Sequence, residues 1–122
     1  MIIPVNALPL QKRNILKGVL AKWITCYIEK IISLSATNKV TFEWKDKKLL
    51  IDINNTGSMR ISIFLKKGEN WRPFIDINNG ELRGAIELDA WFDRYNFKQV
   101  VKKLKLLLKE LKEEWTEWKK KN

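Results

Sequence analysis

Apolar and polar residues alternate through the middle of the chain, between residues 40 and 88. In residues 40–45, Val40, Phe42 and Trp44 are separated by polar residues, which is the period-two pattern of a half-buried strand. Turn signals divide this region, and Asn79-Gly80 is typical of a tight hairpin. The pattern predicts an antiparallel meander of four to five strands, at residues 40–45, 48–54, 59–66, 72–78 and, as a short fifth strand, 82–88.

Helical periodicity lies on both sides of this region. Residues 9–35 carry large apolar side chains at steps of three and four, and Pro9 suits a first helical turn. Residues 89–95 predict a short helix, and Asn96 with Gln99 predicts the N-terminal cap of a long one. We therefore expect an α+β protein with an N-terminal helix, an antiparallel sheet and a long amphipathic C-terminal helix.

The last helix determines the expected domain organisation. At 122 residues the chain is long enough for one domain with its own core. Residues 1–95 would form a helix-plus-sheet core, and residues 96–122 a helix that packs on it. The steps between apolar residues form a short, zipper-like heptad seam, which predicts a homodimer. The seam residues expected at the interface are Leu104, Leu108, Leu111, Trp115 and Trp118. The alternative is a core helix with a solvated end.

The net charge of +10 is the compositional feature that bears most on function. Residues 1–40 carry six Lys or Arg against one acid, residues 41–97 carry nine of each, and residues 98–122 carry nine Lys against four acids. The excess therefore lies in the two helical flanks. A protein this basic is expected to bind a polyanion, most often nucleic acid. The alternative is a Lys-rich surface that only keeps the protein soluble.

One face of the sheet is expected to remain uncovered by the helices. In proteins that bind single-stranded nucleic acid, aromatic rings on such a face stack unpaired bases, and cations beside the rings hold the phosphates. The same arrangement is expected on this sheet face. The alternative is that Phe64 and Phe74 pack under residues 1–8 or against a second copy. Strand alternation, with Trp71 in the loop before the fourth strand, predicts the binding residues Lys45, Arg60, Phe64, Lys66, Trp71, Arg72, Phe74 and Arg83.

The order of elements, the size, the basic character and the seam from Phe97 to Trp118 resemble archaeal single-stranded-DNA-binding proteins of the ThermoDBP type. That resemblance implies a helix-plus-sheet binding domain, a dimerising C-terminal helix and a DNA cleft with hydrophobic and basic residues. The residues that would correspond to that cleft are Phe64, Trp71, Phe74, Arg60 and Arg72.

A second, local resemblance covers residues 40–53 and 80–101. Val-Thr-Phe-Glu-Trp-Lys, Leu-Ile-Asp-Ile and the later Gly-Ala-Ile-Glu-Leu resemble the positive-cofactor (p15) family of transcriptional coactivators. That family implies single-strand binding on a curved sheet by a dimer. This chain departs from it in its long N-terminal helix and its far longer C-terminal helix.

Features of an enzyme are sparse in the sequence. The chain has no histidine, the commonest general base and metal ligand, and Cys26 lies in an amphipathic helical pattern. We expect no catalysis, no metal site and no small-molecule cofactor. The alternative is a metal-dependent nuclease on Asp76 and Glu81, although Arg83 stands where such a site has Lys.

The remaining expectations concern location and partners. The apolar stretches are too short to span a membrane, and residues 1–10 lack the features of a secretory signal. A single cysteine excludes an intramolecular disulfide, so a cytoplasmic setting is expected. The expected partners are single-stranded DNA, which is favoured, or RNA, and a second copy of the chain. The alternative is a protein-interaction or regulatory factor that binds through its Trp-rich helix end, or binds double-stranded DNA nonspecifically.

Overall fold

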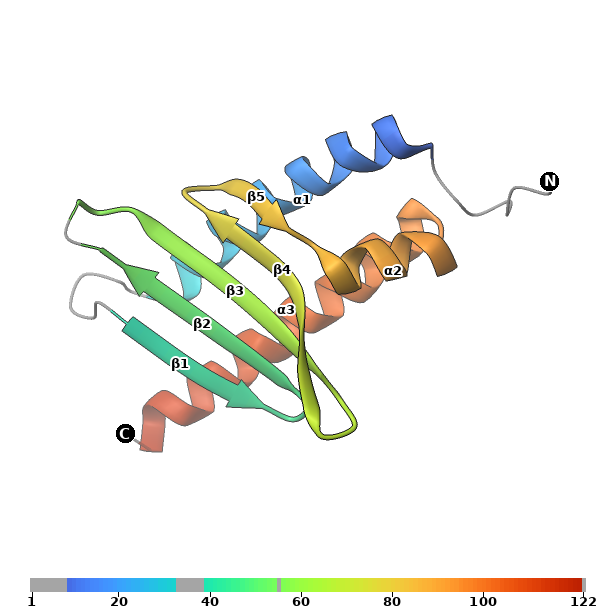
Figure 1. Cartoon of the computed structure of the whole chain (residues 1–122). Coiled ribbons are helices and arrows are strands. Elements are labelled where there is room, and N and C mark those ends of the chain that lie inside the picture. The colour runs from blue at the N-terminus through green and yellow to red at the C-terminus, as the bar shows by residue number, and fades with distance from the viewer. Residues whose placement is uncertain (1–8, 33–38, 55, 122) are drawn as a thin grey trace.

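The computed structural model describes residues 9–32, 39–54 and 56–121. Five strands form one sheet, α1 precedes it, and α2 and α3 follow it (Figure 1). This is the predicted α+β architecture. The first helix ends at Ile31, and Ile32 is already extended, so the helix is shorter than the predicted run to residue 35. Residues 33–38 and the arm of residues 1–8 lie outside the described residues. The elements in chain order are α1 (Leu10–Ile31), β1 (Lys39–Trp44), β2 (Lys47–Ile53), β3 (Met59–Lys67), β4 (Asn70–Asn78), β5 (Glu81–Gly84), α2 (Ile86–Arg94) and α3 (Phe97–Lys121).

The sheet is an antiparallel meander in the order β1-β2-β3-β4-β5. The turn between β4 and β5 is formed by residues that tolerate positive φ: Asn79 and Gly80 both have it, at 51° and 79°. The Asn79 side chain also accepts a hydrogen bond from the Met59 backbone N–H at 2.8 Å. The predicted Asn-Gly hairpin is therefore confirmed, and it joins β4 to β5.

One β-bulge changes which residues of β4 face the helices. Ile63 pairs with Ile75, but Phe64 pairs with Pro73, so Phe74 is an extra residue in β4. Phe74 and Ile75 both turn toward the helices, and Phe74 has an exposed fraction of 0%. The prediction that Phe74 lies on the uncovered face is wrong, because the inserted residue breaks the two-residue alternation.

The start of α2 also differs from the prediction. The expected fifth strand at 82–88 ends at Gly84, and α2 begins at Ile86. The helical turn places Leu88 and Phe92 in the core and leaves Ile86 with an exposed fraction of 64%. Ion pairs then join α2 to α1: Lys17 to Asp89 and Arg13 to Asp93, both at 2.8 Å. The alternation in 82–88 resembles a strand, but tertiary packing selects the helix.

The helices cover one sheet face and share a single hydrophobic core with it. Figure 1 shows α1 and α3 crossing behind the sheet, with no described helix in front of it. The apolar stripe of α3 packs against the sheet of its own chain, so α3 belongs to the same core as α1, α2 and the sheet. The stripe residues buried in this way are Val100, Leu104, Leu107, Leu108, Leu111 and Trp115.

The heptad seam is therefore used within the chain. Trp118 retains an exposed fraction of 44%, but its ring lies 5.1 Å from Trp115 and 6.0 Å from Phe42 of β1, measured between ring centroids. This ring cluster anchors the far end of α3 to β1. A dimer interface on the predicted seam residues would have to displace the sheet, so a second copy would need a different surface.

Candidate nucleic-acid interface

The open face of the sheet is the face opposite the helices. Strand register aligns Glu43, Lys48, Phe64 and Pro73 in one row across it. This face carries five basic residues and four acidic ones, so it is almost neutral and does not share the strong positive charge of the chain. The charged residues are Lys39, Lys48, Arg60, Lys66, Arg83, Glu43, Asp52, Asp76 and Glu81.

Two rings and two lysines gather on this face near the β3–β4 hairpin. The Lys48 Nζ lies 5.2 Å from the ring centroid of Phe64 and 4.8 Å from that of Trp71. The Lys66 Nζ lies 5.8 Å from the Trp71 centroid. Both rings are half-buried, so each is fixed by its neighbours and still has accessible surface. We name Lys48, Phe64, Lys66 and Trp71 the Lys48 cluster.

The bulge at Phe74 decides which aromatic ring of β4 joins this cluster. Trp71 was predicted in a loop, but it lies within β4 and pairs with Lys66. Because the bulge shifts the alternation, Trp71 and Pro73 face outward, whereas Phe74 faces the core. Phe64, Lys66 and Trp71 are thus brought together, as the binding-site prediction requires. Lys48 was missed, although its place directly opposite Phe64 follows from pairing the two predicted strands.

Arg60 lies farther along the open face and is engaged by Asp76. Its Nε and Nη2 donate to the two carboxylate oxygens at 3.0 and 2.9 Å, and the Ser62 hydroxyl donates to Oδ1 at 3.1 Å. The hydrogen bonds from Arg60, with a smaller contribution from Ser62, lower the pKa of Asp76 below its ordinary value despite its partial burial. The same contact raises the pKa of Arg60. Arg83 is exposed on β5 and also favours the charged form of Asp76.

Two other predicted cations lie on the helix side, not on the open face. Arg72 pairs with Leu65 in the register, and its Nη1 is 3.4 Å from Glu87 of α2. Lys45 occupies the β1–β2 turn with φ of 52°, and its Nζ is 3.5 Å from Glu110 of α3. The prediction placed both on the open face and is wrong. The bulge moved Arg72, and the tight turn moved Lys45.

The carboxylates considered for metal-dependent chemistry are arranged differently from a metal site. Both oxygens of Asp76 already accept hydrogen bonds from Arg60 or Ser62. Among the described residues, no group of three or more His, Cys, Asp and Glu side chains is placed to hold a metal ion. Cys26 is exposed on α1.

None of the helices in the described ranges is long and apolar enough to cross a bilayer. No protein-family model, curated protein or solved structure matches this chain. Its function is therefore inferred from the chemistry of its own surface.

Proposed function

We propose that this protein binds single-stranded nucleic acid, with DNA favoured, through the Lys48 cluster. The observation that carries the proposal is a pair of accessible rings, Phe64 and Trp71, with lysine ammonium groups over them on a sheet face that no described helix covers. Rings on a sheet are the common platform for unpaired bases, and the bases of a duplex are already stacked on one another. Such a site selects single strands without reading their sequence.

The cluster can exchange its internal contacts for contacts with the strand. An exposed cation–π contact contributes about 0.5–1 kcal/mol, whereas a base stacked on an aromatic ring contributes about 1–3 kcal/mol. A base can therefore replace an ammonium over a ring at a net gain. The displaced Lys48 or Lys66 is flexible enough to turn toward the neighbouring phosphate.

The charge around the cluster sets how the strand is attracted. The open face is nearly neutral, so most of the long-range attraction comes from the basic helical flanks. Electrostatic steering of this kind mainly raises the association rate and weakens with salt. Ring stacking depends far less on salt. Selectivity for single strands is thus expected to persist at salt concentrations that remove nonspecific binding.

The test is fluorescence anisotropy with matched single- and double-stranded oligonucleotides over a salt series. The wild type is compared with Phe64→Ala/Trp71→Ala, and Val19→Ala is the control because it shortens an exposed apolar side chain on α1, on the opposite side of the sheet. Single-strand preference that the double variant loses and the control retains is the expected result. Equal, salt-labile binding to both forms, unchanged in the double variant, would refute the site.

The second candidate function is nonspecific binding of double-stranded DNA. It is favoured by five exposed lysines in the first half of α3, a stretch with no acidic residue: Lys98, Lys102, Lys103, Lys105 and Lys109. Such a row can neutralise phosphates of either nucleic-acid form. The same salt series separates the two functions, because this row gives no preference for single strands. A protein-interaction role would instead depend on Trp118 and leave binding to both oligonucleotides weak.

The other expectations accompany this proposal as predictions. They are a homodimer, a cytoplasmic location, the absence of catalysis, and the resemblance to ThermoDBP-type proteins and the p15 family. Because the predicted seam residues Leu104, Leu108 and Leu111 are buried within the chain, the proposed homodimer would form through another surface. Analytical ultracentrifugation with and without oligonucleotide measures the first of these directly.

A further inference from the structure

A cleft of about 320 Å³ lies between the end of β3, α2 and α3. Its rings are Trp91 of α2 and Tyr95 directly after it, and both are half-buried. The Lys103 Nζ lies 5.2 Å from the Trp91 centroid and 4.8 Å from that of Tyr95. We name this the hairpin cleft, because the twisted end of the β3–β4 hairpin borders it. Its rings and lysine repeat the arrangement of Lys48 between Phe64 and Trp71.

The hairpin cleft differs from the open face in its charge. Five cations line it, namely Lys47, Lys66, Lys67, Arg94 and Lys103, against the two carboxylates of Asp46 and Glu110. Both carboxylates lie close to Lys47, at 3.0 and 3.5 Å. The Lys47 ammonium lowers the pKa of Asp46, so this carboxylate stays ionised and paired with Lys47 near neutral pH.

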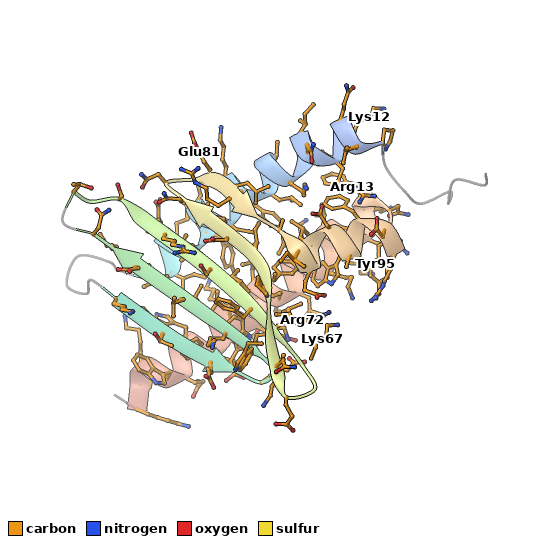
Figure 2. The ribbon with its side chains drawn as sticks, in the orientation of Figure 1. Lys12, Arg13, Lys67, Arg72, Glu81 and Tyr95 are labelled. Carbon is orange, nitrogen blue, oxygen red and sulfur yellow. The ribbon has the colours of Figure 1, made fainter. Side chains whose placement is uncertain are left out.

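The remaining cations of the cleft have no such compensation. Among the residues that the structure describes, Lys67 and Arg94 form no ion pair, and the ammonium groups of Lys66 and Lys103 lie over aromatic rings. Figure 2 shows Lys67 on the β3–β4 hairpin and Tyr95 beyond α2, so these groups converge from elements distant in sequence. Gathered positive charge beside accessible rings fits an anion that also carries a planar group.

The cleft and the open face share one residue. Lys66 lines the hairpin cleft, and its Nζ also lies 5.8 Å from Trp71 in the Lys48 cluster. The hairpin twists strongly at this end (Figure 1), so the two surfaces meet across β3. The volume of the cleft lies at the lower end of the roughly 300–1,000 Å³ seen for small-ligand sites, which suits one nucleotide unit better than a second folded partner.

We infer that the hairpin cleft is a second subsite for the same single strand, which passes over Lys66 from the open face. Lys67 and Arg94 hold phosphates there, and Tyr95 with Trp91 receives a base. This inference rests on the proposed function, and it adds a direction and a minimum length to the bound strand. Short oligonucleotides fill one subsite, whereas longer ones fill both.

The test compares oligothymidylates of about 4 and about 12 nucleotides, lengths that bracket common single-strand site sizes. Three double variants are measured by anisotropy at several salt concentrations. Lys67→Ala/Arg94→Ala alters the cleft, Phe64→Ala/Trp71→Ala alters the open face, and Lys12→Ala/Lys30→Ala removes two exposed charges from α1 as a matched control. Circular dichroism and thermal unfolding confirm that each variant folds.

The cleft variant is expected to lose affinity for the longer strand on the order of tenfold at low salt. Its salt slope, the slope of log affinity against log salt concentration, is expected to be less steep by about two, because two cations that contact phosphates are removed. The α1 control is expected to change far less, and the cleft variant to retain most of its affinity for the short strand. A further variant, Tyr95→Leu, should weaken only the longer strand and leave the salt slope unchanged, because it removes a stacking ring and no charge.

Three other outcomes would each refute the cleft inference, the proposed function or both. If the cleft variant and the α1 control lose the same affinity, the cleft inference fails, and the open-face variant still decides the proposed function. If the longer strand binds no more tightly than the short one, a second subsite is excluded. If the wild type prefers neither strand over duplex DNA, both the proposed function and the inference fail.

Discussion

On the open face, Lys48 lies between Phe64 and Trp71; in the hairpin cleft, Lys103 lies between Trp91 and Tyr95. The lysine-to-ring distances are the same in the two places, but the surroundings are not. Acidic residues balance almost all the charge of the open face, whereas several cations of the cleft form no ion pair within the part of the chain that the structure describes. The comparison shows that similar ring contacts can serve two different energetic roles. Stacking is expected to dominate on the face, and phosphate attraction in the cleft.

The two ring pairs also differ in how they pack against the hydrophobic core. Trp91 lies 4.6 Å from the buried Phe74, measured between ring centroids, so the cleft pair is attached to the core. Phe64 and Trp71 rest on a single layer of sheet and contact lysines on their outer side. Substitutions on the open face can therefore change binding with little effect on folding, whereas substitutions beneath the cleft affect both.

The largest effect is expected from removing the core ring beneath the cleft. Phe74→Ala leaves a cavity under Trp91 and is expected to lower the free energy of unfolding by about 3–5 kcal/mol. Phe64→Ala, on the half-buried outer surface, is expected to cost much less. Chemical denaturation of both variants measures the difference. Equal losses would contradict the bulge, because an unbroken strand would place both rings on the open face.

The next largest effect concerns the stacking ring that the bulge places on the open face. Trp71→Ala is expected to weaken single-strand binding by about 1–3 kcal/mol and to leave duplex binding unchanged. Its salt slope is expected to match that of the wild type, since no charge is removed. Anisotropy titrations at two salt concentrations give both quantities. A loss that appears equally with duplex DNA would show that Trp71 contributes no selectivity.

A smaller effect is expected from changing the charge balance of the open face. Glu43 pairs directly across from Lys48, so it reduces the positive potential beside the ring cluster. Glu43→Gln is expected to strengthen single-strand binding by about 0.2–1 kcal/mol at low salt, with the gain vanishing at high salt. Glu29→Gln, on exposed α1, is the control. If Glu43→Gln and Glu29→Gln strengthen single-strand binding equally, the total charge of the protein, and not the potential beside the Lys48 cluster, sets the affinity.

The smallest expected effect is a pH dependence of stability from the Arg60–Asp76 pair. The pKa of Asp76 is lowered in the folded protein, so its contribution is present above the unfolded-state pKa of about 3.9 and disappears as the pH falls through the lower folded value. Asp76→Asn is expected to unfold with a weaker acid dependence than the wild type. Thermal unfolding between about pH 6 and pH 2 tests this, and an identical acid dependence would show that the pair contributes nothing.

Much of the fold follows from local sequence patterns. The alternation of Phe42 and Trp44, and of Ile61 and Ile63, places the sheet core correctly, because side chains of a strand alternate between its two faces. The Asn79-Gly80 turn is predicted for an equally local reason, the tolerance of those residues for positive φ. The Asn96–Gln99 cap is also confirmed: each side chain accepts a hydrogen bond from the other residue's backbone N–H.

Which residues share a surface depends on tertiary packing. The bulge at Phe74 is stabilised by burial against Trp91, a residue of another element, so no local pattern in β4 reveals that Trp71 replaces Phe74 on the open face. The heptad seam of α3 fits a partner helix or a sheet equally well by periodicity. It packs on the sheet because the apolar face of the chain's own sheet is available to it.

The hairpin cleft is the clearest example of a surface that depends on tertiary packing. Residue type and spacing predict most of the strands, the long helices and the excess of positive charge in the flanks. The sequence by itself could not bring Lys66, Arg94 and Lys103 to one cleft, because that depends on how α2 and α3 pack against a twisted hairpin. Convergence of this kind is set by the shape of the whole core, to which every element contributes.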